Sequence, residues 1–542
     1  MTTPTRTATA DTIPSDSFSS AAPTPIKNMS NITAAFQMLA ALATVNIGIF
    51  SALAAKMSQL DLSMAQKLWT ALFVLVWLLR YTRTFVGVVA YATYRPKTIA
   101  ANPKFTARDA TVIIPTTFKT PHDVIECIER CLTCKPARIF VVTSRANVKL
   151  VKDCLRVNKI LDKVKVLGVE KLNKREQMLR AIPKVRTTVM VFADDDVFWP
   201  DVSYLDRLLA IFENDKVGAG GTRQRVRRDE QPSFWNILGI SYLERRVFNN
   251  VTTNAIDGSI STLSGRTSAY RAQILQTKEF AHYFRNDKWR GKPLNSDDDK
   301  CLTRYVYSHG WKICLQFDPK AVLETTVEGD RKYLAQCMRW ARAHWRGNFT
   351  VMENETYWCS PTYWWGTYVI YFGQFWTPAI VVEAAMASLL WMGLGGTELA
   401  KPAFIALACW IAFTKNLKMI PHFCKYPQDM KYIPVLMAFS YIHGFMNVYA
   451  ALSMEQTQWG SQNLAALETA RAKKEAELVP LLQEAIIVET PHIDDRLEKV
   501  LHPPQGTIDP FAPTPAPVSA DGTQLVDDEY LSDEDEDEDI MN

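Results

Sequence analysis

Two patterns of apolar residues divide the chain. Between about Pro103 and Glu328, short apolar runs alternate with stretches of helical periodicity. The runs typical of buried strands are Ala110–Pro115, Ala137–Thr143, Val164–Val169 and Val185–Ala193, and helical spacing covers Asp123–Leu132. Strands that alternate with helices are typical of βαβ units and predict a mostly parallel sheet. We therefore expect this part of the chain to form one α/β domain of the size of a nucleotide-binding domain.

The second pattern consists of long runs with few or no charges. Ile32–Ala55 is long enough to cross a bilayer as a helix, and another run begins near Leu68. Arg80 and Arg83 cross that run, and Arg95 and Lys97 follow it, so the positive-inside rule puts this end in the cytosol. Further runs are Tyr363–Leu394, Pro402–Ile420 and Tyr432–Met454. Because five full spans would put the two ends of the chain on opposite sides, we expect one of these last runs to lie along the interface or to re-enter.

These patterns predict a multi-pass membrane protein with its α/β domain inserted between membrane helices. The expected divisions are a disordered tail (1–30), two transmembrane helices (31–95), a cytosolic catalytic domain (103–330), interfacial amphipathic helices (331–362), C-terminal transmembrane or interfacial helices (363–456), a cytosolic segment with polar helices (457–500) and a disordered acidic tail (501–542). The first tail is rich in Thr, Ser, Ala and Pro and lacks the layout of a signal peptide.

Charge is distributed unevenly over the 542 residues. The formal net charge is +4, but Asp527–Asp539 holds ten acidic residues and no basic one, which leaves a body with a net charge of +14. Such a body favours an anionic partner: a nucleotide, a lipid headgroup or an acidic polymer. The ten cysteines lack secretory spacing, and Cys127, Cys131 and Cys134 have only His122 nearby. We expect reduced thiols without a metal.

Three consecutive acids, Asp194–Asp196, end the strand predicted over Val185–Ala193. In open α/β sheets, ligands bind at the carboxyl ends of strands. Adjacent carboxylates repel one another unless a cation lies among them, and hard oxygen ligands suit Mg²⁺ or Mn²⁺. Side chains alternate along extended backbone, so Asp194 and Asp196 can face one ion together. The alternative interpretation is a solvated acidic turn that caps the next helix.

Five further motifs accompany these acids. They are N-K-R-E-Q-M (Asn173–Met178), which we place on the loop before the fourth strand, S-G-R-T-S-A-Y-R (Ser264–Arg271), N-S-D-D-D-K-C-L-T (Asn295–Thr303), Q-C-M-R-W (Gln336–Trp340) and Q-W-G-S (Gln458–Ser461). Flanked by apolar runs, this combination resembles the inverting processive glycosyltransferases of family 2, which include hyaluronan, cellulose and chitin synthases. It is most similar to fungal polysaccharide synthases related to hyaluronan and type 3 capsule synthases. The resemblance extends from about Ile32 to Ser461 and implies a glycosyltransferase A-type fold.

The resemblance also implies a donor site for a UDP-sugar with Mg²⁺ or Mn²⁺. Asp196 would hold the metal, and Asp194 would lie near the ribose or the metal. Positive charge around the leaving diphosphate would come from Lys174, Arg175 and Arg339. The remaining donor-site residues would be Thr116 and Thr117 at the uridine, Gln336 near the diphosphate or acceptor, and Trp459 in an element resembling W-G-T-R. Gln462 stands where that element has an arginine.

On the acceptor side, the same resemblance makes Asp299 the general base and Asp298 its neighbour. One displacement would then invert the anomeric centre without a covalent intermediate. The acceptor's terminal sugar would stack on Trp340, and Gly265 would permit close backbone approach. Alternatively, Trp340 is an interfacial anchor and Asp297–Asp299 is a helix N-cap.

Other features leave alternatives open. The run of Arg223, Arg225, Arg227 and Arg228 fits a solvated or lipid-facing loop as well as a polymer or nucleotide contact. Two positions depart from the family pattern: Val141–Ser144 lacks the usual acid, and Pro115-Thr116-Thr117 lacks the usual Asn-Glu. Glu383 and His443 lie inside apolar runs, where they would line a channel or hydrogen-bond neighbouring helices.

Three functions compete at this point. The first is a processive polymerase in the plasma membrane that exports its polysaccharide through its own helices, with no nucleic-acid partner. The second is a non-processive enzyme that glycosylates a lipid, such as a ceramide glucosyltransferase. The third is a transporter whose cytosolic domain only regulates it. No G-x-x-x-x-G-K-[ST] loop is present, which argues against an ATP-driven motor. The motifs do not identify the sugar.

Overall fold

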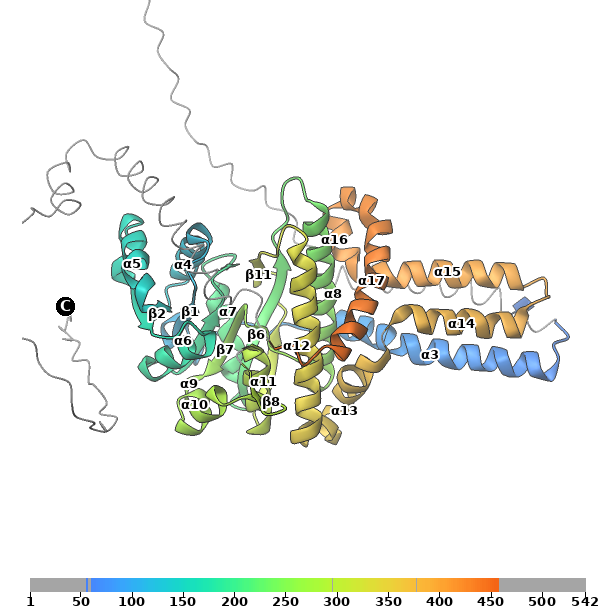
Figure 1. The fold of residues 1–542 in the computed structure, drawn as a ribbon, viewed down its shortest axis with the longest axis horizontal. Coiled ribbons are helices and arrows are strands. Elements are labelled where there is room, and N and C mark those ends of the chain that lie inside the picture. Colours follow the sequence, from blue (N-terminus) through green and yellow to red (C-terminus); the bar gives the residue numbers. More distant parts are fainter. Residues whose placement is uncertain (1–54, 57–59, 295, 377, 458–542) are drawn as a thin grey trace, which may run out of the picture. The chain divides into compact units, whose positions relative to one another are not determined.

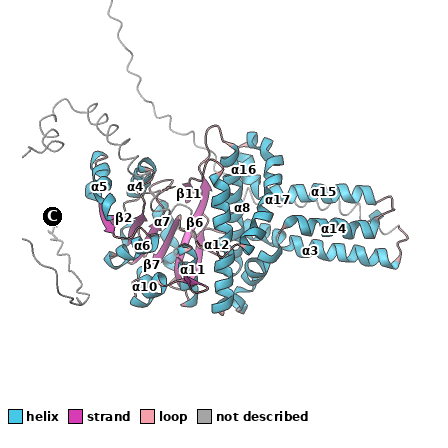
Figure 2. Ribbon diagram, in the orientation of Figure 1, coloured by secondary structure: helices cyan, strands magenta, loops and turns pink. Residues whose placement is uncertain are grey.

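In the computed structural model of the protein, the described residues are 55–56, 60–294, 296–376 and 378–457. Nine strands in this part of the chain form one sheet in the order β3-β2-β1-β4-β7-β6-β11-β5, and β10 also pairs with β6 (Figure 2). Their bounds are β1 Ala110–Pro115, β2 Arg138–Ser144, β3 Val164–Val169, β4 Val189–Ala193, β5 Val197–Phe198, β6 Val217–Val226, β7 Thr267–Arg271, β10 Lys312–Gln316 and β11 Val322–Thr325. A separate two-stranded ribbon pairs β8 (Lys288–Trp289) with β9 (Lys292–Pro293).

Most neighbouring strands are parallel, which confirms the predicted α/β fold with a mostly parallel sheet. β1 pairs in parallel with both β2 and β4, and β6 does so with β10 and β11. Two strands are exceptions: β7 runs antiparallel between β4 and β6, and the short β5 pairs antiparallel with β11. Ala193 at the end of β4 therefore lies opposite Thr267 at the start of β7. This reversal brings the loop before β7 to the edge where β4 delivers its acids.

Helices cover both faces of the sheet. Side chains alternate along β1, so Val112 and Ile114 face one hydrophobic core while Ile113 faces the other. The first core includes side chains of α4 (Pro121–Thr133), α5 (Val148–Val157) and α7 (Tyr204–Leu209). The second includes side chains of α6 (Lys174–Ala181), α9 (Ala272–Leu275), α10 (Lys278–Arg285) and α11 (Asp298–Ser308). The motif at Asn173–Met178 therefore begins a helix, α6, and is not the loop that we predicted.

A third hydrophobic core joins the remaining long helices. They are α3 (Met64–Thr93), α8 (Phe234–Asp257), α12 (Lys332–Asn354), α14 (Ala379–Leu394), α15 (Ala400–Asn416) and α17 (Ile433–Leu452), with the short α13 (Trp364–Gly366) and α16 (Ile420–Lys425) between them. Figure 1 shows α8 and α12 between the sheet and the parallel trio α3, α14 and α15. The amphipathic stretch predicted around Gln336–Trp340 belongs to α12.

Three helical segments of the described chain are long and apolar enough to cross a membrane. They are Met64–Thr93, Ala400–Lys425 and Pro427–Leu452. A fourth candidate is bent by 82° between Pro361–Trp376 and Ala379–Leu394, the geometry of a broken span or a re-entrant loop. The expected span at Ile32–Ala55 lies outside the described residues apart from its last residue, as do the tails and Trp459.

Candidate active site

Lys174 joins the two acidic motifs. As the first residue of α6, it extends its ammonium group to Asp194 Oδ1 at 2.7 Å and to Asp298 Oδ2 at 3.2 Å. Burial opposes the charge of Lys174, but Asp194 and Asp298 raise its pKa above the ordinary value. Burial also opposes ionisation of Asp194, and Lys174 nevertheless holds the pKa of that carboxyl below its usual value. The ammonium group of Lys174 thus connects the end of β4 with the start of α11.

Gly265 lies at the centre of this group. A Cβ atom at Gly265 would be 3.3 Å from Lys174 Nζ, 3.8 Å from Asp299 Cβ and 3.9 Å from Asp194 Oδ1. The close approach follows from the antiparallel β7, because the Asp194 backbone N–H donates to the carbonyl of Arg266, one residue beyond Gly265, at 3.0 Å. A larger side chain at Gly265 would occupy the space between the three charged groups.

The other two acids after β4 have neutral partners. Thr116 Oγ1 donates to Asp195 at 2.5 Å, and Thr326 Oγ1 donates to Asp196 at 3.0 Å. Burial, followed by the charges of Asp194 and Asp195, raises the pKa of Asp196 to about 7. Burial raises the pKa of Asp195 as well. Burial and the charges of neighbouring carboxylates therefore oppose the ionisation of Asp195 and Asp196 at the end of β4.

The acids at the start of α11 have different environments. Asp297 adopts a left-handed conformation (φ 63°) and forms a bidentate ion pair with Arg346 of α12, at 2.9 and 3.1 Å. Both side chains are almost completely buried, and Arg346 also donates to the carbonyls of Met454 and Gln456. Asp297 is the N-cap residue of α11, with Asp298 and Asp299 in the first turn, as the helix-cap interpretation has it, but its side chain makes no capping bond and pairs with Arg346. Burial, with the charge of Asp298, raises the pKa of Asp299 to about 6.

Residues of the Q-x-x-R-W motif face this group from α12. Arg339 exerts its charge on Asp194, as does Arg266. Trp340 stacks on Tyr242 with ring centroids 5.1 Å apart, and the Arg266 guanidinium lies 5.4 Å from the Trp340 ring centroid. Gln336 accepts a 3.4 Å hydrogen bond from the backbone N–H of Glu328, two residues after Thr326. Trp340 is therefore held inside the protein by aromatic and cationic neighbours and is half-buried.

Two sequence predictions need correction. Arg175 does not point toward the acids: its guanidinium is buried and bonds Asp287 and the carbonyls of Phe284 and Ser296. The arginine run around β6 is neither a solvated nor a lipid-facing loop. Three of its four members pair with acids of the protein, Arg223 with Glu244 at 3.2 Å, Arg227 with Glu126 at 2.9 Å and Arg228 with Asp429 at 2.8 Å.

Other predicted residues take supporting positions. The Asn147 side chain donates to the Thr117 carbonyl at 3.3 Å, and Gln177 donates to the Thr116 carbonyl at 2.9 Å. Glu383 accepts bonds from Lys415 at 2.9 Å and Tyr441 at 2.7 Å, and so links α14, α15 and α17. The His443 ring lies near Tyr242 and Phe439.

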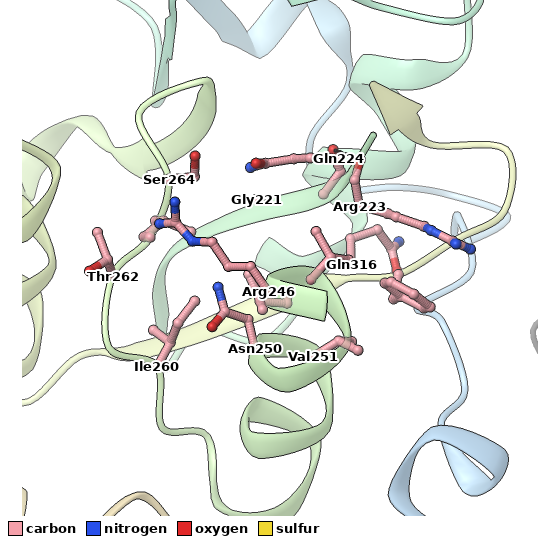
Figure 3. Close-up of a pocket in the computed structure, with 15 residues that line it drawn as sticks. Gly221, Arg223, Gln224, Arg246, Asn250, Val251, Ile260, Thr262, Ser264 and Gln316 are labelled. Carbon is pink, nitrogen blue, oxygen red and sulfur yellow. Dashed lines mark hydrogen bonds between the residues drawn. The ribbon is translucent and has the colours of Figure 1, made fainter. Parts of the chain in front are cut away.

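Sequence reasoning missed Thr326, Arg266, Arg346 and Lys300. The Lys300 ammonium is buried next to Asp299 and donates to Ser261 Oγ at 2.8 Å and Asn348 Oδ1 at 3.2 Å. Beside this group, a pocket lies between β6, β10, α8 and the Ile260–Ser264 loop. Arg246 extends across it toward Thr262 and Ser264 (Figure 3). Arg266 and Lys300 lie beside the predicted residues Gly265 and Asp299, which was a signal available in the sequence.

An α/β sheet that gathers acids and a lysine at its strand ends has the architecture of a nucleotide-binding transferase domain. Residues 107–343 match the family model for "Glycosyltransferase like family 2". A type 2 glycosyltransferase of Gibberella zeae is 37% identical over 456 residues, which cover 82% of this chain and 84% of that protein. The chain belongs to glycosyltransferase family 2, and its sheet is that of a glycosyltransferase A-like domain.

Two more distant similarities accompany this match. The hyaluronan synthase of Streptococcus pyogenes is 22% identical over 296 residues, covering 53% of this chain and 66% of that protein. The mannosyltransferase PcManGT of Pyrobaculum calidifontis, solved with GDP-Man and Mn²⁺, has 15% identity and a TM-score of 0.45 over 72% of this chain and all of that one.

Proposed function

We propose that this family 2 glycosyltransferase is a membrane-embedded, inverting enzyme that transfers a sugar from a UDP-sugar to a growing polysaccharide. The observation that supports this proposal best is the contact of Lys174 with both Asp194 and Asp298. That contact joins an acidic strand end, suited to a nucleotide diphosphate, to a second acidic group that can accept a proton. The proposed donor site comprises Lys174, Asp194, Arg339 and Gln336, with Thr116 and Thr117 below it and Trp459 outside the described residues.

The proposal includes a divalent cation held by Asp196 and Asp194. Within the described residues, no group of three or more His, Cys, Asp or Glu side chains is arranged to hold a metal ion. This fits Mg²⁺ or Mn²⁺, which take one or two carboxylates and complete their shells with substrate phosphates and water. The raised pKa of Asp196 reflects burial and the negative charge that a cation would offset. When bound, the ion would neutralise the leaving diphosphate.

Asp299 is the proposed general base. Its pKa of about 6 leaves the carboxylate ionised at neutral pH while keeping it more basic than an exposed aspartate. The acceptor hydroxyl would give its proton to Asp299 as its oxygen forms a bond to the anomeric carbon. The bond from that carbon to the diphosphate oxygen would break, and UDP would leave with the electron pair. Lys174 and Arg339 would stabilise its charge, Asp298 would orient Lys174, and Trp340 would contact the acceptor sugar.

The helices support placement in a membrane. The three long apolar helical segments and the bent pair provide a bundle directly beside α8 and α12. In this proposal the bundle carries the product outward, the catalytic domain is cytosolic and the membrane is the plasma membrane. Glu383, bonded to Lys415 and Tyr441, would brace this bundle.

The test uses the full chain purified in detergent. It would be incubated with Mn²⁺ and, separately, with UDP-glucose, UDP-N-acetylglucosamine, UDP-glucuronic acid and GDP-mannose. The proposal expects UDP release from at least one UDP-sugar, a long product, and loss of both in Asp299→Asn. Release only from GDP-mannose would contradict the donor assignment. A short product that stays lipid-extractable would favour a lipid glycosyltransferase.

A further inference from the structure

Thr303 joins the first turn of α11 to the loop that precedes β7 (residues 259–266). Its hydroxyl donates to the backbone carbonyl of Asp299, four residues earlier on α11, at 2.6 Å. The same oxygen accepts a hydrogen bond from the backbone N–H of Leu263 at 2.8 Å. Thr303 and Leu263 are both buried, so water does not compete for these bonds. One hydroxyl therefore bridges the main chain of the proposed base and the main chain of the loop.

Lys300 forms a second connection between α11 and the same loop. Its buried ammonium group donates to Ser261 Oγ at 2.8 Å, to the Ser261 carbonyl at 3.2 Å and to Asn348 Oδ1 at 3.2 Å. Three acceptors match the three N–H donors of an ammonium group. Asn348 lies on α12, and its amide group also donates to Gln374 Oε1 at 3.1 Å. The Lys300 side chain is thus held on one side by the loop and on the other by α12.

Gly347 of α12 provides the space through which Lys300 passes. A Cβ atom at Gly347 would lie 2.5 Å from Lys300 Cδ and 3.0 Å from Lys300 Cε. Glycine in a helix interior costs about 1 kcal/mol relative to alanine, so it does not serve the stability of α12 itself. A side chain at this position would displace the lysine from Ser261 and Asn348.

The loop held by these two connections lies directly against the proposed base. A Cβ atom at Gly265 of this loop would be 3.8 Å from Asp299 Cβ. The Asp299 carboxylate accepts one hydrogen bond within the described residues, from the backbone N–H of Lys300 to Oδ1 at 2.9 Å. No hydrogen bond or ion pair from that part of the chain reaches Oδ2. The position of the carboxylate therefore depends on the backbone of α11, and Thr303 and Lys300 fix that backbone to the loop.

We propose that Thr303 and Lys300 are positioning residues, which hold the carboxylate of Asp299 in place against Gly265 for proton transfer. The inference rests on the proposed function and deepens it, because it assigns two further residues to the reaction without a contact to the substrate. A general base must lie within hydrogen-bonding reach of the proton that it accepts, and a displacement of about 1 Å can cost about 100-fold in rate. Two independent connections to one loop limit such a displacement.

The main test is Thr303→Val, because valine keeps the shape of the side chain and every charge while it removes the hydroxyl. With the full chain in detergent and Mn²⁺, we expect the kcat of UDP release to fall about 10- to 100-fold, and the donor KM to change less than about twofold. Thr303→Ser keeps the hydroxyl and should restore kcat to within about threefold of the wild type. Thr252→Val is the matched control and should leave kcat unchanged. Thr252 is buried in α8, and its hydroxyl likewise bonds the carbonyl four residues earlier, that of Phe248, at 2.9 Å.

A double-mutant cycle separates positioning from a general loss of structure. Added to Asp299→Asn, Thr303→Val should lower the residual transfer by less than about twofold, because no base is left to position. Radiolabelled donor would measure this residual rate. A loss as large as in the wild-type background would overturn the proposal, and so would a wild-type kcat in Thr303→Val. Unchanged transfer in Asp299→Asn alone is a different result, because it would refute the proposed function itself.

The second connection keeps the proposal testable if Thr303→Val does not fold. Lys300→Met retains the apolar stem and removes a buried charge that has only neutral acceptors, so its Tm should not fall. Its kcat should nevertheless fall at least about tenfold, and Gly347→Ala should have the same effect by displacing the lysine. If Lys300→Met and Gly347→Ala both kept the wild-type kcat, Lys300 would have no positioning role and the proposal would fail.

Discussion

The protein contains two triplets of consecutive aspartates, and their surroundings give them different chemistry. Asp194–Asp196 at the end of β4 meets one cation, Lys174, and two threonines, so two of its three carboxyls have raised pKa values, mainly through burial. At the start of α11, Asp297 pairs with Arg346 and Asp298 with Lys174, while burial and the charge of Asp298 raise the pKa of Asp299. A triplet with surplus charge suits a metal ion, whereas a triplet with a single basic carboxylate suits proton transfer.

The largest expected effect is a loss of sugar transfer that distinguishes Asp299 from its neighbour Asp298 in the second triplet. Asp299→Asn removes the proposed base, and we expect sugar transfer to fall by about 10³- to 10⁴-fold. Donor binding should change little, because Lys174 and Asp194 remain. The measurement is UDP release at saturating donor together with donor affinity by calorimetry. Asp298→Asn is the matched comparison, and an equal loss in both variants would mean that the triplet acts as a unit.

The pair between Asp297 and Arg346 should matter mainly for stability. Arg346→Met leaves Asp297 as an uncompensated buried charge, so we expect destabilisation by about 3–5 kcal/mol, measured by denaturation in detergent. Adding Asp297→Gly should recover much of this loss, since glycine tolerates the left-handed backbone and brings no charge. Arg290→Gln is the control: it breaks an exposed pair with Glu455 and should cost less than about 1 kcal/mol. A double variant as unstable as Arg346→Met would contradict this explanation.

Within the first triplet, Asp196 and Asp195 should differ in their dependence on metal. We expect Asp196→Asn to raise the Mn²⁺ concentration for half-maximal transfer at least about 100-fold, because it would lose a direct ligand. Asp195→Asn should have a smaller effect, since its carboxyl is bonded by Thr116. A Mn²⁺ titration of UDP release distinguishes the two. Equal shifts in both variants would mean that the metal is shared across the triplet.

The proposed donor end of the site was predictable because it depends on short-range pattern. The apolar run before Asp194 predicts a buried strand, and the parallel sheet predicts where that strand delivers its acids. The strand expected over Ala110–Pro115 has those bounds, and the strand expected over Val185–Ala193 begins later, at Val189. The antiparallel β7 was not predicted, although it brings Gly265 and Arg266 beside Asp194.

The surroundings of the proposed acceptor side could not be predicted, because they depend on contacts between distant helices. A basic residue such as Arg346 on an amphipathic helix is usually solvated, and only the partner Asp297 shows why this one is buried. Arg175 likewise follows Lys174 directly, but the helical turn of α6 directs it to Asp287 on the other side. Arg223, Arg227 and Arg228 pair with acids in three separate segments, which no local pattern encodes.

The smallest expected effect is a shift in the pH dependence of kcat, which tests whether Asp299 of the second triplet accepts the proton. Because the pKa of Asp299 is raised to about 6, the base is protonated below that pH and ionised above it. We expect kcat to fall about tenfold per pH unit below 6 and to be flat from 6.5 to 8. Burial is the larger cause of the raised pKa, and Asp298 adds to it. Asp298→Asn should therefore move the acidic limb of the curve of kcat against pH to lower pH by less than about one unit. Lys174→Gln should move this limb to higher pH. If the limb stayed in place in both variants, it would belong to a group outside this triplet, and Asp299 would not be the base.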